Sequence, residues 1–416
     1  MYKQRRTNYL NQIRKHSLSV FYSGRAQQKS NDQSFPFSVN RNFFYLTGVE
    51  QENVILLLAK GEETTASYLF IGVNDPVKVL WDGAGLTFEQ ASMLGQLEPC
   101  EVKDIKEFDS LIHSLLSTTR KALFGSIDTF YLDLERQNEL ADDTVAIKQA
   151  HHLTNLYPFL NIQSNQMILA ELRTVKDQTE IEQVKKAIEI TNQGLFRIMQ
   201  SLKPGIAEYQ AEAEFNYILN QHRVSPSFNT IVAGGKNATI LHYVDNAEKI
   251  SDGNLVLFDL GVACGNYCSD ITRVYPVNGK FSDRQKAIYE VVLKANKETI
   301  EWLRPGVTLH EFKEYGKAIL IEGAKELGLI KEDEEINKYY YHGLGHYLGL
   351  DVHDIGNYSA VIPEGALITV EPGLYIAEEG IGIRIEDDVV VTKDGTINLS
   401  KSIIKEISDI EAFMKR

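Results

Sequence analysis

Four acidic residues and one histidine in the second half of the chain have the types and spacing of a metal-ion site. Asp259, Asp270, Glu371 and Glu386 each interrupt an apolar run typical of a β-strand, and His346 lies in a glycine-marked segment between Asp270 and Glu371. A buried carboxylate is costly without a partner. Hard divalent cations prefer anionic oxygen ligands, so four carboxylates and an imidazole would suit two such ions. Two neighbouring ions can activate water and polarise a carbonyl group, which is the chemistry of hydrolysis.

The first two acids are predicted to lie on neighbouring strands. Asp259 falls in the run 256–260 and Asp270 in the run 267–275, and glycines between the runs suit a hairpin. Adjacent antiparallel strands would present both carboxylates on one face of a sheet.

The other two acids fall in runs of the same kind. Glu371 lies at the end of the run 367–371, which a Pro-Gly turn closes, and Glu386 lies in the run 383–391. A single acid in such a place is usually a solvated residue of an edge strand. Four acids with a histidine between them are much harder to explain in that way.

The histidine segment does not have the pattern of a helix. His342 and His346 are four residues apart, as in helical metal-binding pairs. However, Gly343 and Gly345 disfavour a regular helix there. Each histidine taken alone is more often structural than a ligand.

These segments together resemble the signature of the dinuclear-metal peptidases with a pita-bread fold, which include methionine aminopeptidases, Xaa-Pro dipeptidases and aminopeptidase P. The segments that carry the resemblance are 259–261, 269–273, 342–346, 371–375 and 384–387. His242 and His353 resemble positions of the proline-directed branch. The segment 35–48 is similar to the N-terminal domain of aminopeptidase P, although prolidases carry a related domain.

The resemblance implies a metal-dependent exopeptidase that releases the N-terminal residue from peptides with proline in the second position. It implies that Asp259 binds one metal ion, that His346 and Glu371 bind the other, and that Asp270 and Glu386 bridge both. The implied cofactor is a pair of divalent ions, which we expect to be manganese. The implied partner is a peptide substrate.

The resemblance also implies roles around the metal ions. Glu371 would shuttle a proton to the leaving nitrogen. His242 and His353 would bind the substrate, and one of them would stabilise the oxyanion. Arg384 would orient a carboxylate or contact the substrate, and the alternative for it is a surface ion pair. His342 would have a supporting position.

Two other functions remain open. A dipeptidase for Xaa-Pro would cleave the dipeptide and reject longer chains. A binding module of the same fold would have lost catalysis, but such a protein is expected to lack metal ligands, and all five are present here.

The pattern of apolar residues predicts an α/β N-terminal domain over residues 1–170 and an α+β pita-bread catalytic domain over residues 171–416. In the first domain, strand-like runs at 54–58 and 68–73 precede a helical apolar stripe within 108–116.

Two Pro-Gly pairs in the second domain, at 204–205 and 305–306, can each close one helix and precede another. They indicate either an internal duplication or ordinary punctuation between helices. In the first domain, Trp81 is expected in the core, and the alternative is an aromatic contribution to a neighbouring subunit.

Composition limits the possible partners and compartments. The chain has 416 residues, 43% of them apolar, and a net charge of −14 without a basic block, which argues against nucleic acid and anionic membrane as partners. Three cysteines cannot form a disulfide framework, and Cys264 and Cys268 are poor companions for hard oxygen ligands. We expect a cytoplasmic homo-oligomer, although a start without acidic residues before Asp32 also resembles a transit peptide.

Overall fold

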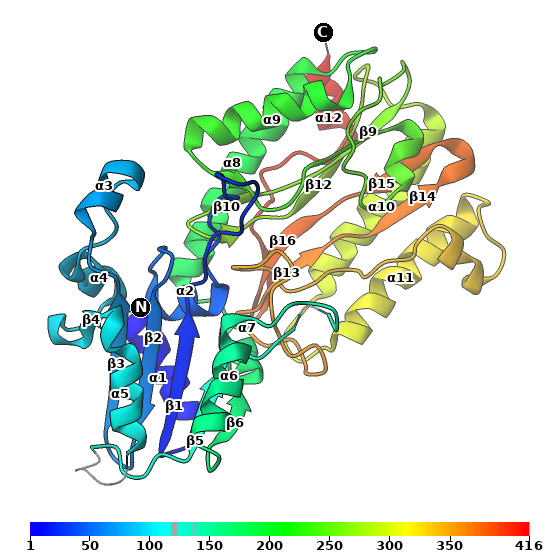
Figure 1. Ribbon diagram of the computed structural model, residues 1–416. Coiled ribbons are helices and arrows are strands. Elements are labelled where there is room, and N and C mark those ends of the chain that lie inside the picture. The colour runs from blue at the N-terminus through cyan, green and yellow to red at the C-terminus, as the bar shows by residue number, and fades with distance from the viewer. Residues whose placement is uncertain (118–122, 137, 416) are drawn as a thin grey trace. The chain divides into compact units, whose positions relative to one another are not determined.

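The chain forms two compact units, Met1–Leu172 and Arg173–Arg416. The structure is a computed structural model that describes residues 1–117, 123–136 and 138–415 (Figure 1). Among these residues no helix has both the length and the apolar character needed to cross a membrane.

The first unit is a mixed six-stranded sheet with helices on both faces. The strand order is β4-β3-β2-β1-β5-β6; β2 is antiparallel to β1 and β3, and the other neighbours are parallel. The strands are β1 (Ser17–Tyr22), β2 (Ile55–Lys60), β3 (Thr65–Ile71), β4 (Val102–Asp104), β5 (Thr129–Leu132) and β6 (Asn161–Ser164). The helices are α1 (Tyr2–Gln12), α2 (Arg41–Thr47), α3 (Pro76–Asp82), α4 (Phe88–Gly95), α5 (Phe108–Leu116), α6 (Val145–Leu156) and α7 (Gln166–Thr174), which runs across the division between the units.

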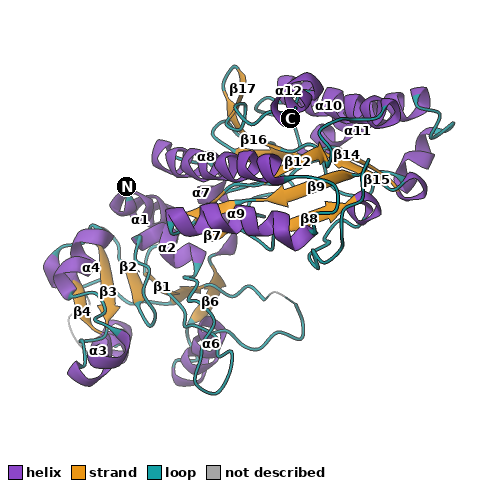
Figure 2. Cartoon of the chain, turned by 90° about the horizontal axis from the view of Figure 1, so that it is seen from above, coloured by secondary structure: helices purple, strands orange, loops and turns teal. Residues whose placement is uncertain are grey.

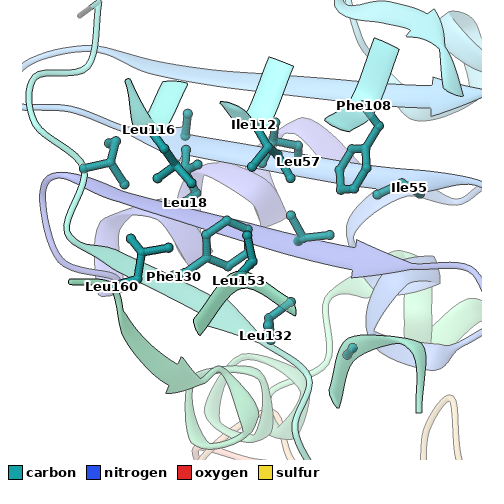
Figure 3. Close-up of a cluster of buried hydrophobic side chains, with 14 of the residues drawn as sticks. Leu18, Ile55, Leu57, Phe108, Ile112, Leu116, Phe130, Leu132, Leu153 and Leu160 are labelled. Carbon is teal, nitrogen blue, oxygen red and sulfur yellow. The ribbon is translucent and has the colours of Figure 1, made fainter. Parts of the chain in front are cut away.

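The alternation of side chains along β1 explains why helices cover both faces of this sheet. Leu18 and Val20 point to one face, where they join a buried cluster with α5 and α6 (Figure 3). The buried stripe of α5 consists of Phe108, Ile112 and Leu116, which confirms the predicted apolar stripe. On the other face, the ring of Phe21 lies 5.3 Å from the ring of Tyr9 in α1.

Trp81 is not a core residue, so that expectation is wrong. It lies on α3, none of whose residues is buried, and it is 84% exposed. The helix is set up by local signals instead: Asp75 caps it by accepting a hydrogen bond from the Val77 N–H (2.8 Å), and Pro76 occupies the first turn.

The second unit consists of long helices and four small sheets. The helices are α8 (Gln178–Ser201), α9 (Glu208–His222), α10 (Asp283–Trp302), α11 (Leu309–Glu326) and α12 (Ile407–Met414). The sheets have the strand orders β11-β10-β7, β12-β9-β8, β13-β16-β17 and β14-β15. Their strands are β7 (Ser225–Pro226), β8 (Ile231–Gly234), β9 (Leu255–Leu260), β10 (Val262–Cys264), β11 (Tyr267–Cys268), β12 (Ile271–Pro276), β13 (Leu367–Val370), β14 (Gly373–Ile376), β15 (Ile381–Arg384), β16 (Asp387–Thr392) and β17 (Gly395–Asn398).

Two helix pairs repeat the same local arrangement in this unit. Helix α8 packs against α9 (Figure 2), and α10 packs against α11. The Pro-Gly pairs lie between the helices of each pair, as predicted. In the first pair the Gly205 N–H donates to the Ile250 carbonyl (2.8 Å), and in the second the Gly306 N–H donates to the Ile362 carbonyl (3.0 Å). This equivalence favours the internal duplication over chance punctuation.

Candidate metal centre and substrate cavity

One cavity of about 620 Å³ in the second unit brings together every residue that the sequence predicts for the site. These residues are Asp259, Asp270, His346, Glu371, Glu386, His242, His353 and Arg384. His342 lines the same cavity. The residues come from seven separate segments, so the fold and not the local sequence assembles them.

Three of the four acids lie where the chain leaves one sheet and enters another. Asp270 lies between β11 and β12, and Glu371 between β13 and β14. Glu386 lies between β15 and β16. The continuous strands predicted through Asp270 and Glu386 are therefore wrong, whereas the run before Glu371 ends at its Pro-Gly turn as predicted. Of the four acids only Asp259 lies inside a strand, β9. A residue at such a switch does not use its side chain to pack a sheet face, and it can project into the cavity.

His346 presents one ring nitrogen to the carboxylates. Its Nδ1 lies 3.0 Å from the Tyr347 carbonyl oxygen, which can only accept, so the proton belongs on Nδ1. Nε2 is then free to bind a cation. This atom lies 3.5 Å from Asp270 Oδ2 and 3.7 Å from Glu371 Oε1.

Gly345 allows the histidine segment to lie against β13. A Cβ atom on Gly345 would lie 1.9 Å from the Thr369 carbonyl oxygen, which is a severe clash. With glycine there, the Thr369 N–H donates to the His346 carbonyl (2.9 Å) and the His346 N–H donates to Thr369 Oγ1 (3.1 Å). The imidazole is thereby fixed to the strand that precedes Glu371.

The cavity holds more negative charge than its own cations offset. Burial, together with repulsion from neighbouring carboxylates, raises the pKa values of Asp270 and Glu386 well above the ordinary range. Burial raises the pKa of Glu371 to about 6, against the opposing effects of His346 and Arg384. Repulsion of this kind is what a bound cation would relieve.

Two features of the donors fit divalent cations. Asp270, His346 and Glu386 each offer a ligand atom, and the three atoms lie within 4.8 Å of one another. The Oδ1 atom of Asp259 is buried and has no hydrogen-bond donor among the described residues. An unpartnered buried carboxylate oxygen beside this cluster is suited to a metal ion.

Arg384 connects the acids to one another. Its guanidinium donates to Asp259 Oδ2 (2.6 Å), to Thr272 Oγ1 (3.0 Å) and to the Tyr375 hydroxyl (2.8 Å). Thr272 in turn donates to Glu386 Oε2 (2.6 Å). The alternative of a surface ion pair is wrong, because Arg384 is only 4% exposed.

Thr272 and Tyr375 are hydrogen-bond partners of the candidate site that motifs and spacing do not reveal. Both lie in the segments that carry the family resemblance. The only sequence signal for Thr272 is strand pairing, since it lies directly opposite Asp259 in the antiparallel register of β9 and β12. No signal marks Tyr375 before its partner Arg384 is known.

Two other histidines of the cavity, His353 and His342, favour their neutral forms. The ring of His353 lies 4.0 Å from that of His346, and burial, with electrostatic effects of His346 and His242, lowers the pKa of His353 to about 4. Burial and Arg384 lower the pKa of His342 to about 3, and its Nε2 lies 2.8 Å from the Tyr375 hydroxyl oxygen. Neutral imidazoles can offer a hydrogen bond to a substrate without adding charge.

Five apolar residues also line the cavity, and we call them the apolar wall. They are Phe228, Ile231, Leu241, Val244 and Val352. Sequence patterns do not reveal this wall, because its residues come from loops and strand starts without a shared period. A cavity lined by both carboxylates and an apolar wall suits a substrate with a polar reacting group and an apolar ring.

Comparisons with known proteins agree with this geometry. Residues 182–393 match the model of metallopeptidase family M24, and residues 2–124 match the N-terminal domain of aminopeptidase P. The chain is 36% identical to the Xaa-Pro aminopeptidase of Haemophilus influenzae, over 99% of this chain and 96% of that protein. It is 33% identical to the Xaa-Pro aminopeptidase of Escherichia coli, over 99% of this chain and 97% of that protein.

Solved structures give the same result. A putative aminopeptidase P from Bacillus anthracis is similar with a TM-score of 0.96 and 42% identity, over 100% of this chain and 97% of that one. The zinc-substituted aminopeptidase P of Escherichia coli in complex with product is similar with a TM-score of 0.89 and 32% identity, over 99% of this chain and 97% of that one.

Proposed function

The chain belongs to metallopeptidase family M24, and from that premise we propose that it is a metal-dependent aminopeptidase that releases the N-terminal residue from peptides with proline in the second position. The family resemblance and the fold class expected from the sequence, an α/β N-terminal domain and an α+β catalytic domain, are confirmed. The observation that carries the function is the single cavity that gathers four carboxylates and four histidines.

We propose that five residues hold two divalent cations, with manganese as the physiological ion. These residues are Asp259, Asp270, His346, Glu371 and Glu386. Their chemistry supports the assignment, because oxygen donors with one imidazole suit hard divalent ions. When bound, such ions supply an activated water and a polarised carbonyl group.

The remaining roles follow from what each side chain can reach. Glu371, with a pKa near 6 before any ion binds, can accept a proton and return it to the leaving nitrogen. His242 and His353 line the cavity and would hydrogen-bond the substrate. Arg384 would keep Asp259 in position and, through Thr272, also steady Glu386.

The preference for proline is supported by the apolar wall. An Xaa-Pro bond is a tertiary amide without a hydrogen to donate, and its ring is rigid. The apolar wall defined above offers a surface for that ring, while the carboxylates would hold the ions that polarise the reacting carbonyl group.

The direct test is cleavage of Xaa-Pro-Yaa and Xaa-Pro peptides with added Mn²⁺ and with chelator. We expect release of the first residue from the tripeptide, none with chelator, and little cleavage of a matched Xaa-Ala-Yaa peptide. Cleavage of the dipeptide alone would identify an Xaa-Pro dipeptidase. No cleavage of either peptide with Mn²⁺ present would contradict the enzymatic assignment.

The proposal includes a homo-oligomer in the cytoplasm. Helix α3 supports the first part, because Leu80 and Trp81 are 86% and 84% exposed on a short helix without a buried residue. The three cysteines are free thiols, which suits a reducing compartment. Light scattering of the wild type and of Leu80→Glu tests the oligomer, which the variant should weaken.

A further inference from the structure

Glu208 is a buried carboxylate outside the candidate metal centre. It is the first residue of α9, and it has no exposed surface. Among the described residues, no lysine, arginine or histidine pairs with its carboxylate. The first turn of a helix favours a negative charge, but burial of a charge this deep requires hydrogen bonds as well.

Four hydrogen bonds converge on this carboxylate. Its Oε1 accepts from the Gly234 N–H (2.8 Å) and from Asn237 Nδ2 (3.0 Å). Its Oε2 accepts from the Tyr243 hydroxyl (2.8 Å) and from the Glu248 N–H (2.9 Å). A carboxylate offers about four lone-pair positions, so its capacity as an acceptor is full.

All four donors belong to one segment, residues 234–248, which we name the histidine loop. The bonds from Gly234 and Glu248 hold its two ends, and the bond from Tyr243 holds its middle. His242 directly precedes Tyr243 and lines the cavity, as Leu241 does. Glu208 itself does not line the cavity.

We propose that Glu208 is a positioning residue that fixes the histidine loop and so aims His242 at the substrate. This inference rests on the proposed function, because it needs a substrate for His242 to meet. A looser histidine loop would leave the carboxylate cluster intact. It would, however, displace the imidazole from the peptide bond, and small displacements of a positioned group lower catalytic rates strongly.

Glu208→Gln is the sharpest variant. The two oxygens accept from different backbone N–H groups, at Gly234 and at Glu248. A glutamine amide has only one oxygen, so in either orientation its NH₂ group faces one of these N–H donors. The substitution keeps the shape of the side chain and releases one end of the histidine loop.

Tyr243→Phe and Glu212→Gln are the companion variants. Tyr243→Phe removes one of the four bonds and leaves both ends of the histidine loop held. Glu212 lies on α9 one turn after Glu208 and accepts from Asn246 Nδ2 (2.9 Å), which also donates to the Thr230 carbonyl (2.9 Å). Glu212 thus also contacts the histidine loop, but among the described residues it accepts only this one bond, which the oxygen of a glutamine can still accept. Glu212→Gln is therefore a matched control: it makes the same acid-to-amide change on the same helix without releasing the histidine loop.

The experiment measures kcat and KM on an Xaa-Pro-Yaa peptide with saturating Mn²⁺. We expect kcat/KM to fall about 10- to 100-fold in Glu208→Gln, as for partners that orient active-site ligands. We expect a fall of about 2- to 10-fold in Tyr243→Phe, from the loss of one hydrogen bond. Glu212→Gln should stay within about twofold of the wild type.

The double variant Glu208→Gln/His242→Ala separates positioning from general destabilisation. If Glu208 acts through His242, the double variant is no worse than His242→Ala alone. The inference would be overturned if the losses of kcat/KM in the two single variants multiplied in the double variant. It would also be overturned if His242→Ala lowered kcat/KM and Glu208→Gln did not. Mn²⁺ affinity should be equal in Glu208→Gln and wild type, and a parallel loss of affinity would also count against positioning.

Hydrogen exchange makes failure of the inference distinguishable from failure of the proposed function. Amides of the histidine loop should exchange faster in Glu208→Gln, while those of β9 are unchanged. If the wild type did not cleave the peptide, the proposed function would be contradicted. Hydrogen exchange would still report whether Glu208 holds the histidine loop. If the wild type were active and hydrogen exchange in the histidine loop were the same in Glu208→Gln as in the wild type, only the inference about Glu208 would be contradicted.

Discussion

Two neighbouring residues, Glu386 and Asp387, lie in opposite electrostatic environments. Glu386 belongs to the acidic cavity, where burial and other carboxylates raise its pKa. Asp387 is equally buried, but Arg273 donates to its Oδ1 (2.7 Å) and Lys405 forms an ion pair with its Oδ2. Although burial alone would raise the pKa of Asp387, these two cations lower it below the ordinary value.

We call Arg273, Asp387 and Lys405 the balanced cluster. It is closed by further hydrogen bonds, from Ser400 Oγ to Asp387 (2.8 Å) and from Lys405 to Asn296 (2.6 Å). Its one carboxylate is offset within the protein by two cations, so it needs no further cation from solution. The acidic cavity has four carboxylates and one guanidinium, so the remaining negative charge must be offset by bound protons or by a bound cation.

The largest expected effect is on catalysis in the cavity. Glu371→Gln removes a group that can carry a proton, so kcat on an Xaa-Pro-Yaa peptide with Mn²⁺ should fall about 10²- to 10⁴-fold. The variant should still fold, because the substitution leaves the ion pairs of the balanced cluster intact. The exposed Glu364→Gln is the control and should retain wild-type kcat. Near-normal kcat in Glu371→Gln would contradict the catalytic role that distinguishes the acidic cavity from the balanced cluster.

In the balanced cluster the effect should be on stability. Asp387→Asn leaves Arg273 and Lys405 buried without their anion, which should cost about 3–5 kcal/mol of unfolding free energy. Urea unfolding in chelator measures this loss. The exposed Asp394→Asn should unfold like the wild type. A larger stabilisation by Mn²⁺ in Asp387→Asn than in the wild type would show that the cluster is not self-contained.

The pH dependence of the metal-free protein gives a smaller effect. The pKa of Glu371 is raised to about 6 in the fold, so its contribution to stability is present below its ordinary pKa of 4.5 and is lost as pH rises through about 6. From about 1.4 kcal/mol per pKa unit, the loss is about 2 kcal/mol. His353, with a lowered pKa of about 4, acts with the opposite sign, losing stability as pH falls.

The contribution of Glu371 to this pH dependence can be separated from that of the histidines. It is given by the difference between the melting temperatures of the wild type and of Glu371→Gln at each pH. In chelator this difference should fall between pH 4.5 and 7, because glutamine does not titrate. With Mn²⁺ bound the ionised carboxylate is favoured, and the fall should disappear. A difference that rises with pH in chelator would contradict a raised pKa of Glu371 in the folded protein.

The smallest expected effect is a gain in stability. Asp270→Asn removes one of the mutually repelling carboxylates, so in chelator it should raise the melting temperature by a few degrees, equivalent to about 1 kcal/mol. The same variant should lose the rise that Mn²⁺ produces in the wild type. Thermal scans with chelator and with Mn²⁺ test both statements. A lower melting temperature in chelator would mean that Asp270 is already balanced.

Sequence reasoning found the ligand candidates because several rare signals coincide. An acid within an apolar run is expensive, and Asp259, Asp270, Glu371 and Glu386 repeat that pattern beside a glycine-marked histidine. The Pro-Gly turn marks the strand break at Glu371. The breaks at Asp270 and Glu386 cannot be predicted, because the strand-like pattern continues through each two-residue switch and only the sheet pairings distinguish one strand from two.

Other features depend on contacts between distant segments. Glu208 is an ordinary helix-start acid by sequence, and its role appears only when the histidine loop folds back onto it. Phe228 and Val352 form one wall, but no period connects them. Trp81 was misjudged because large aromatic residues usually lie in cores, whereas a cap and a proline were enough to place it on an exposed helix.

The most direct test is an anomalous-scattering map from crystals grown with Mn²⁺. The account predicts two manganese peaks in the cavity, about 3.5–4 Å apart as in two-metal hydrolases. Their ligands should be Asp259, Asp270, His346, Glu371 and Glu386, and no peak should lie at the balanced cluster. A cavity without manganese at saturating Mn²⁺ would contradict the account.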